Sequence, residues 1–462
     1  MYKLSAAIVF IFLFFQNGAS DQLCSVRKTE NYCVCKRVTS QDESSVVTEA
    51  DCSRIHLQSV PSQDQLTADL NLLDLSHNEI QELDENKNKL SSRTLQTLIL
   101  SYNEISSISD KFFSEIPDLR KLILSHNKIT TLDNRALFEN CQKLTYLDLS
   151  FNHINTIQID VFLPLVQLQF IDLSYNDNAL GEWLTQNSDF LTHKLGLSLN
   201  ISTIKLDNLN LTDLGNLYFV NYTNLKHLSL ADNHFQEVPR VPYSVEYLDL
   251  SGSDISVLEV KQLSYHSLKT LRLDRMKKLE NIHPYAFYNL EALEELSIRN
   301  CNNLKEFNEL VFGAMFKNMV SKLKRLSLSG NALQHLNITY KYLFRTLDLV
   351  DLTDNPWTCD CDLLWLQEVD NLYKSDKIKC TSPTTLNSKK LIDVTERNVP
   401  LCYPQKFGKK SHRILISFLS LLVILLASLV AYLIYYAPKW YNNGSRRLGP
   451  ESPYNVARND LD

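Results

Sequence analysis

An unusual spacing of leucines, repeated along the chain, limits what this sequence can fold into. In the segment LTYLDLSFNHI, residues 144–154, apolar residues stand at offsets 0, 3, 5 and 10, and an asparagine stands at offset 8. This spacing matches neither the helix period of about 3.6 residues nor the strand period of about 2. It occurs in twelve units, most of them 23 to 25 residues apart, which begin at Leu70, Leu95, Leu119, Leu144, Leu168, Ile201, Leu225, Val245, Leu268, Leu293, Leu323 and Leu347. A chain that repeats one short pattern at this period stacks the same small element many times.

The pattern has a direct physical interpretation. Its L-x-L part predicts a short strand with the leucines pointing inward, and the asparagine turns the chain while its amide bonds backbone groups of the neighbouring unit. One unit cannot bury its own leucine face, so neighbours must share a core. A period of this length is typical of a leucine-rich repeat solenoid, with a parallel sheet on the concave face and return segments on the convex side. We therefore expect an α/β fold with about twelve repeats over residues 70–354.

Two apolar segments predict the route of the chain across a membrane. Residues 1–20 have the positive start, apolar run and small residues of a secretory signal peptide, with cleavage expected after Ser20. The competing interpretation of this segment is a retained anchor. Residues 414–436 are 23 uncharged residues, long enough for a membrane-spanning helix. With a linker at 406–413 and a cytoplasmic tail at 437–462, we expect a single-pass plasma-membrane protein whose larger part is extracellular.

Eight of the ten cysteines gather at the two ends of the repeats. One quartet precedes the repeats and the other follows them: Cys24, Cys33, Cys35 and Cys52, then Cys359, Cys361, Cys380 and Cys402. The ends of a solenoid expose its core, so we expect disulfide-bonded caps at 21–69 and 355–405. Zinc is the competing interpretation of each quartet, and spacing alone leaves three pairings open. Cys141 and Cys301 lie too far apart to pair and are expected to be buried thiols.

The segment NPWTCDCDLLWL, Asn355–Leu366, resembles the C-terminal cysteine cap of extracellular leucine-rich repeat proteins. This family includes Toll-like receptor ectodomains, neuronal leucine-rich repeat transmembrane proteins and Slit-like modules, and the resemblance covers residues 24–402. The N-terminal quartet resembles the matching cap, with wider spacing. The family implies a curved solenoid that binds proteins or microbial ligands. It also implies the disulfides Cys24–Cys35, Cys33–Cys52, Cys359–Cys380 and Cys361–Cys402. Residues 437–462 are too short for a Toll-type signalling domain, which needs roughly 100–150 residues.

Aromatic residues at exposed positions of repeats two to five are the first candidate ligand contacts. They are expected in adjacent columns of the concave face and comprise Tyr102, Tyr146, Phe151, Phe170 and Tyr175. Exposed aromatic residues are favoured anchors of protein interfaces. The competing interpretation is that Tyr, Phe or His often precedes the turn asparagine in this family, without a binding role.

Basic residues of repeats nine to eleven form the alternative candidate. They are Arg272, Arg275, Arg299, Lys324 and Arg325, and together they would suit an acidic partner or a sulfated glycan. Glu294 and Glu295 interrupt this patch, which favours a mixed, solvated face. Four N-glycosylation sequons precede the predicted membrane span, at Asn200, Asn210, Asn221 and Asn337, and a fifth at Asn443 follows it and is expected to be unmodified.

Other function classes receive no support from the sequence. The net charge of −6 gives no nucleic-acid character. The sequence has no nucleophile elbow, phosphate-binding loop or zinc-protease helix, so we expect neither catalysis nor a metal or cofactor. The leading hypothesis is a cell-surface receptor, co-receptor or adhesion molecule for a protein ligand or a neighbouring cell-surface protein. The alternatives are an innate immune accessory receptor for a glycan or microbial ligand, and a passive membrane-anchored matrix protein.

Overall fold

The computed structural model describes residues 24–25, 33–39, 46–62, 65–87, 89–185, 191, 194–215, 218–219, 221–313, 322–395, 399 and 418–432. The chain divides into two compact units, Met1–Val394 and Thr395–Asp462. The predicted signal peptide, linker and tail lie outside the described residues, as does Cys402.

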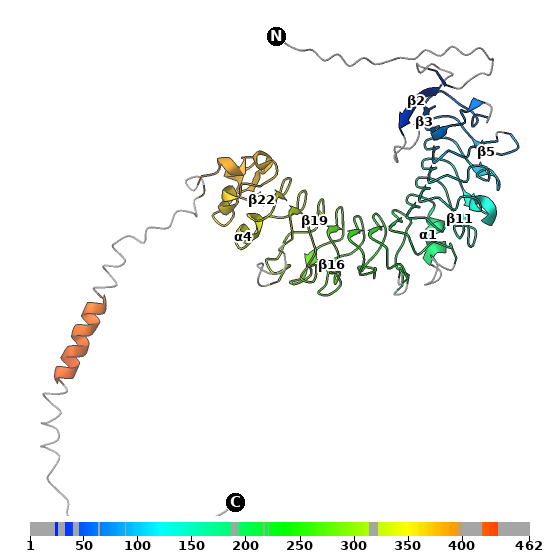
Figure 1. Cartoon of the computed structure of the whole chain (residues 1–462). Coiled ribbons are helices and arrows are strands. Elements are labelled where there is room, and N and C mark those ends of the chain that lie inside the picture. The colour runs from blue at the N-terminus through cyan, green and yellow to red at the C-terminus, as the bar shows by residue number, and fades with distance from the viewer. Residues whose placement is uncertain are drawn as a thin grey trace, which may run out of the picture. The chain divides into compact units, whose positions relative to one another are not determined.

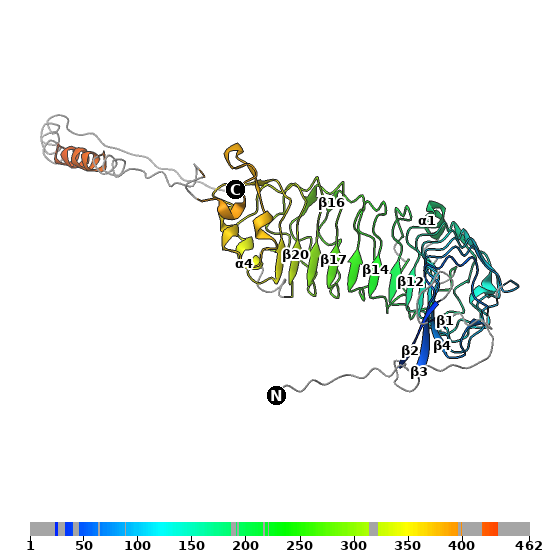
Figure 2. The ribbon, with the colours of Figure 1, turned by 90° about the horizontal axis from the view of Figure 1, so that it is seen from above.

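The first unit is a solenoid around one sheet of 15 strands. Its N-terminal end consists of β1 (Cys24–Ser25), β2 (Cys33–Thr39) and β3 (Val46–Asp51). Each of the twelve expected repeats then supplies one strand: β4 (Leu70–Asp74), β6 (Thr97–Ile99), β8 (Lys121–Ile123), β10 (Tyr146–Asp148), β12 (Phe170–Asp172), β13 (Thr203–Lys205), β14 (His227–Ser229), β15 (Tyr247–Asp249), β17 (Thr270–Arg272), β19 (Glu295–Ser297), β20 (Arg325–Ser327) and β21 (Leu349–Asp351). These twelve strands lie side by side and pair in parallel (Figure 2).

The return segments form the other side of the solenoid. In Figure 1 the sheet follows the inner side of an arc, while β5, β11 and β16 lie on its outer side. Short two-stranded sheets occur there: β5 (Glu82–Leu83) with β7 (Ser107–Ile108), β9 (Thr131–Leu132) with β11 (Thr156–Ile157), and β16 (Val257–Leu258) with β18 (Asn281–Ile282). In the described part of the first unit, three helical segments lie within the repeats: η2 (Arg135–Phe138), α1 (Asn178–Thr185) and α4 (Tyr340–Phe344). Four more follow the last repeat: η3 (Leu364–Glu368), η4 (Ser375–Lys377), η5 (Thr384–Leu386) and η6 (Leu391–Asp393).

The core between these two sides contains the repeated leucines and the turn asparagines. Leu147 and its equivalents in the other strands are fully buried. The amide of Asn152 donates to the carbonyl oxygen of Leu124 in the preceding repeat at 3.0 Å, and its oxygen accepts the N–H of Ile129 at 3.1 Å. The same kind of bond to the preceding repeat recurs at Asn103, Asn127, Asn176, Asn233, Asn331 and Asn355. In the first repeat, the amide of Asn78 donates instead to the carbonyl oxygen of Cys52 in the N-terminal cap. The predicted role of the asparagine, pairing buried backbone groups across repeats, is confirmed.

The solenoid is closed at both ends by disulfide-bonded segments. Cys33 pairs with Cys52 across the antiparallel strands β2 and β3, and β3 then pairs with the first repeat strand β4. At the other end Cys359 pairs with Cys380, beside β22 (Trp357–Thr358) and β23 (Cys380–Ser382). These are two of the four pairs that the family resemblance implies, and they remove those cysteines from any zinc site.

The remaining cysteines fall into two groups. Cys35 and Cys361 are also disulfide-bonded, but the partners predicted for them are Cys24 and Cys402. The Cys24 side chain and the whole of Cys402 lie outside the described part of the chain. Cys141 and Cys301 are buried free thiols, as predicted.

Of the second unit, the structure describes residues 395, 399 and 418–432. Within the predicted membrane span 414–436, residues 418–432 form an exposed helix. Among the residues that the structure describes, we find no helix with both the length and the apolar character needed to cross a membrane.

Candidate functional site

Strand register arranges the outward side chains of the sheet into columns. The residues just before the buried strand leucine form what we call the first column, which includes Tyr146, Phe170, Thr203, His227 and Tyr247. The residues just after that leucine form the second column, which includes Asp148, Asp172, Lys205, Ser229 and Asp249. Side chains from different repeats therefore come into contact although they are 20 or more residues apart in sequence.

A further column follows the strands, where the chain turns. The residue four positions after the strand leucine or its equivalent has a φ of +51° to +74° in all twelve repeats. We call these residues the edge column: His77, Tyr102, His126, Phe151, Tyr175, Asn208, Asp232, Gly252, Arg275, Asn300, Gly330 and Asp354. Left-handed backbone is uncommon for residues other than glycine. Its recurrence in every repeat shows that the tertiary fold imposes the turn.

The first five residues of the edge column form a continuous stack of rings. Neighbouring ring centroids from His77 through Tyr102, His126 and Phe151 to Tyr175 are 4.1–4.3 Å apart, with interplanar angles of 5–10°. Tyr102 is 47% exposed and Phe151 41% exposed. We call this feature the aromatic ladder. It contains three of the five predicted aromatic contacts and adds two histidines, and burial lowers the pKa of His126.

The other two predicted aromatic residues form a separate pair. Tyr146 and Phe170 stack at 4.0 Å in the first column, with Lys121 Nζ 4.7 Å from the ring centroid of Tyr146 and Lys205 Nζ 5.4 Å from that of Phe170. The second column lies between this pair and the aromatic ladder. The five residues therefore belong to two surfaces at opposite ends of the strands, and do not form the single patch in adjacent columns that the sequence suggested.

The predicted basic residues are paired with acidic neighbours. Salt bridges join Arg275 to Asp232 at 2.9 Å, Arg299 to Asp274 at 2.8 Å, Lys324 to Glu294 at 2.7 Å and Arg325 to Glu295 at 2.5 Å. Arg272 donates to the hydroxyl of Tyr247 at 3.5 Å. These partners compensate most of the positive charge, which favours the mixed face over a basic patch.

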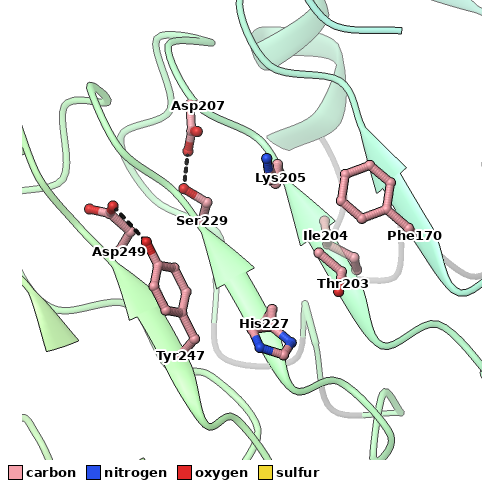
Figure 3. Close-up of a pocket in the computed structure, with 9 residues that line it drawn as sticks. All are labelled: Phe170, Thr203, Ile204, Lys205, Asp207, His227, Ser229, Tyr247 and Asp249. Atoms are coloured by element: carbon pink, nitrogen blue, oxygen red, sulfur yellow. Dashed lines mark hydrogen bonds between the residues drawn. The ribbon is translucent and has the colours of Figure 1, made fainter. Parts of the chain in front are cut away.

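A hollow of about 450 Å³ opens on the sheet between β12 and β15 (Figure 3). Phe170 and Tyr247 stand on either side of it, and the smaller side chains of Thr203 and Ser229 lie between them. The complete lining is Phe170, Thr203, Ile204, Lys205, Asp207, His227, Ser229, Tyr247 and Asp249. In the first column Thr203 and His227 lie between the two rings, and the His227 ring is 6.0 Å from that of Tyr247, so the space opens over Thr203 and Ser229.

Carboxylates dominate the electrostatics of this hollow. Asp207 accepts bonds from the Ser229 hydroxyl at 2.6 Å and the Ala231 N–H at 2.8 Å. Burial raises the pKa of Asp207 to about 6, and the nearby carboxylates of Asp249 and Asp172 act in the same direction. Lys205 Nζ lies 3.4 Å from Asp172, so its charge is already paired.

Of the residues that line the hollow, the sequence predicts only Phe170 as a ligand contact. One available signal was Asp207 itself, which stands where most repeats carry serine. The sequons lie outside the strands: Asn200, Asn221 and Asn337 are exposed, and Asn210 is half-buried.

Comparison with known families agrees with this architecture. Residues 93–139 and 134–177 match the leucine rich repeat family, and residues 244–351 match the BspA type leucine rich repeat region. The fold and these matches define the class: the chain contains a solenoid of leucine-rich repeats.

Individual relatives share the repeats to different extents. The chain is similar to Tsukushi of Gallus gallus, with 28% identity over 68% of this chain and 75% of that protein. It is 29% identical to the disease resistance protein RPS4B of Arabidopsis thaliana over 45% of this chain, but spans only 17% of that relative. Among solved structures, the mouse RP105/MD-1 complex contains a chain with a TM-score of 0.53 and 21% identity, covering 71% of this chain and 54% of that one.

Proposed function

We propose that this protein is a cell-surface receptor, co-receptor or adhesion molecule whose concave face binds a protein ligand. The observation that carries the proposal is the aromatic ladder, whose rings are held by stacking while Tyr102 and Phe151 remain 47% and 41% exposed. Rigid aromatic side chains lose little conformational entropy on binding and are enriched among the residues that dominate interface energies. A leucine-rich repeat solenoid also suits interaction better than catalysis.

Several features support placement outside the cell. Residues 1–20 have the pattern of a secretory signal peptide, and residues 414–436 have that of a membrane anchor. Disulfides such as Cys33–Cys52 persist in oxidising compartments. Three of the four sequons are exposed and would accept glycans there.

The proposal is tested with the full chain, carrying a C-terminal tag, expressed in cultured cells. Antibody against residues 46–395 should stain intact cells, and protease added outside should remove this part while sparing the tag. Stained cells are then screened against purified cell-surface ectodomains and against microbial glycans and lipoproteins. An ectodomain ligand is expected. Absence of surface staining would refute the cellular placement, and binding of microbial ligands alone would instead support the immune accessory receptor.

The binding face is tested on the ligand found in that screen. Replacing Tyr102 and Phe151 together by alanine should weaken binding at least tenfold, because two exposed anchors are lost. Tyr342→Ala is the matched control, since Tyr342 is 76% exposed but lies on α4, outside the ladder. Equal affinities of the ladder variant and the control variant would contradict a role for the ladder.

A further inference from the structure

The solenoid contains the same carboxylate motif twice, half-buried at Asp207 and buried at Asp274. Asp207 and Asp274 occupy the position three residues after the buried strand residue, in the sixth and ninth repeats. Most other repeats carry a small hydroxyl residue there: Ser76, Ser101, Ser125, Ser150, Ser174, Ser251, Ser329 and Thr353. The two aspartates are therefore exceptions to the repeat pattern, and their surroundings can be compared directly.

The following repeat gives both carboxylates the same two hydrogen bonds. Oδ1 of Asp207 accepts the Ser229 hydroxyl at 2.6 Å and the Ala231 N–H at 2.8 Å. Oδ1 of Asp274 accepts the hydroxyl of its neighbouring serine, Ser297, at 2.7 Å and the Arg299 N–H at 2.9 Å. The carboxylate oxygen Oδ1 therefore has the same two kinds of hydrogen-bond donor in both repeats.

The two sites differ in the hydrogen-bond donors to the second carboxylate oxygen, Oδ2. Oδ2 of Asp274 accepts Nε and Nη2 of Arg299 at 3.1 and 2.8 Å, a guanidinium–carboxylate pair. The equivalent residue beside Asp207 is Ala231, and no ion pair of Asp207 occurs within the described part of the chain. Burial raises the pKa of both carboxyl groups, but hydrogen bonds from Arg299 and Ser297 hold that of Asp274 below its ordinary value. The pKa of Asp207 stays raised.

Asp207 also borders open space, because it lines the hollow between Phe170 and Tyr247 (Figure 3). Aromatic faces attract a guanidinium group, and arginine stacks on them more readily than lysine. The charges around the hollow are negative in sum: Asp172, Asp207 and Asp249 stand against Lys205 and Arg272. Of the cations, Lys205 is held by Asp172, and Arg272 lies next to Asp249 in the second column.

We propose that this hollow is the seat of an arginine side chain from a protein partner, with Asp207 as its counter-ion and Tyr247 as a stacking wall. The inference rests on the proposed function and names the chemistry that the partner presents. The chain itself contains an example of this mode of binding, because the guanidinium of Arg299 pairs with the equivalent carboxylate, Asp274. A citrulline side chain has a similar shape but no charge, so it should bind poorly.

The test uses the full chain displayed on cells and three random heptapeptide libraries whose central residue is fixed as arginine, lysine or citrulline. Wild-type cells should retain the arginine library about tenfold more than the citrulline library, with lysine between them, corresponding to one guanidinium–carboxylate pair. Asp207→Asn should remove this preference, since its amide still accepts both hydrogen bonds but carries no charge. Asp110→Asn is the matched control, because Asp110 is exposed and follows β7 on the outer side.

A second variant tests the proposed arginine site by filling it with an arginine of the chain itself. Ala231→Arg places a guanidinium beside Asp207 at the position that Arg299, in the tenth repeat, holds beside Asp274, so it should abolish the arginine preference without lowering the unfolding temperature. The proposed arginine site would be refuted if wild-type cells retained the arginine and citrulline libraries equally. It would also be refuted if Asp207→Asn left the preference for arginine unchanged. The proposed function would survive that result if a folded ectodomain still bound through Tyr102 and Phe151, so the two failures are distinguishable.

Discussion

The phenol of Tyr175 donates a hydrogen bond of 3.0 Å to Asp232, which lies 57 residues further along the chain and two repeats away. The same carboxylate accepts Nη2 of Arg275 at 2.9 and 3.0 Å. Burial and the bond to Asp232 raise the pKa of Tyr175 to about 12, so the phenol remains a donor at neutral pH. Asp232 thus connects the last ring of the aromatic ladder to the charged half of the edge column.

The salt bridge from Asp232 to Arg275 passes Gly252, the residue that lies between them in the edge column, and depends on its lack of a side chain. Gly252 has a φ of +74°, and a Cβ built there would lie 2.2 Å from Asp232 Oδ1. We predict that Gly252→Ala lowers the free energy of unfolding by about 2–3 kcal/mol, from backbone strain and steric overlap together. Gly215→Ala is the matched control, because its φ is +64° but nothing lies within 4 Å. Denaturant unfolding should show the smaller loss in Gly215→Ala; equal losses would rule out the steric contribution.

The turn asparagines should contribute strongly to stability. Asn233 is fully buried, donates to the carbonyl oxygens of Leu206 and Leu230 at 2.8 and 2.9 Å, and accepts two backbone N–H groups at 3.0 Å. Asn233→Ala leaves these groups unpaired and should cost about 2–4 kcal/mol. Thermal unfolding compared with Asn224→Ala, an exposed asparagine, measures the difference. A cost below about 0.5 kcal/mol would show that water replaces the amide.

The two free thiols should be inert in the native protein. Cys141 and Cys301 are buried, and burial raises the pKa of each thiol to about 12. Because the thiolate is the reactive form, we expect iodoacetamide to leave both unmodified at pH 8 and to label both in guanidinium chloride. Peptide mass mapping reads each site separately. Rapid native labelling of either cysteine would mean that its repeat opens locally.

The stability of the solenoid should depend on pH through Asp207. Its pKa is raised to about 6 in the folded chain, so folding favours the protonated form. This stabilisation is complete below the ordinary carboxyl pKa near 3.8 and is lost as the pH rises through about 6. The ionised group faces Asp172, Asp249, Lys205 and His227.

Asp207→Asn avoids this ionisation and should raise the free energy of unfolding at pH 7.5 by about 1–3 kcal/mol. The gain should shrink between pH 6 and pH 4, as the wild-type carboxyl group becomes protonated. Denaturant unfolding at several pH values provides the measurement, with Asp110→Asn, at an exposed position, as the matched control. A gain of the same size at pH 4 and pH 7.5 would show that the carboxylate is not its cause.

Much of the fold is readable from the sequence because the repeat is a local pattern. The spacing of Leu144, Leu147, Leu149 and Asn152 specifies a strand, its inward face and the turn after it, and each expected repeat contributed one strand. Cysteine positions likewise indicated where the solenoid ends. The arrangement of the outward side chains was predicted less well. Tyr146 and Phe151 belong to one repeat, yet they lie on separate surfaces, because one precedes the strand leucine and the other follows the turn.

The sequence by itself therefore determined the unit: short strands with leucines inside, asparagines at the turns and cysteines at both ends. Only the tertiary structure decided which side chains meet, because register and stacking bring together residues that are 20 to 60 positions apart. The ring stack at His77 and His126, the bridge from Tyr175 to Asp232 and the hydrogen bonds of Ser229 and Ala231 to Asp207 all arise in this way. Spacing along one repeat contains no information about its neighbour's outward side chains, and those side chains form the candidate site.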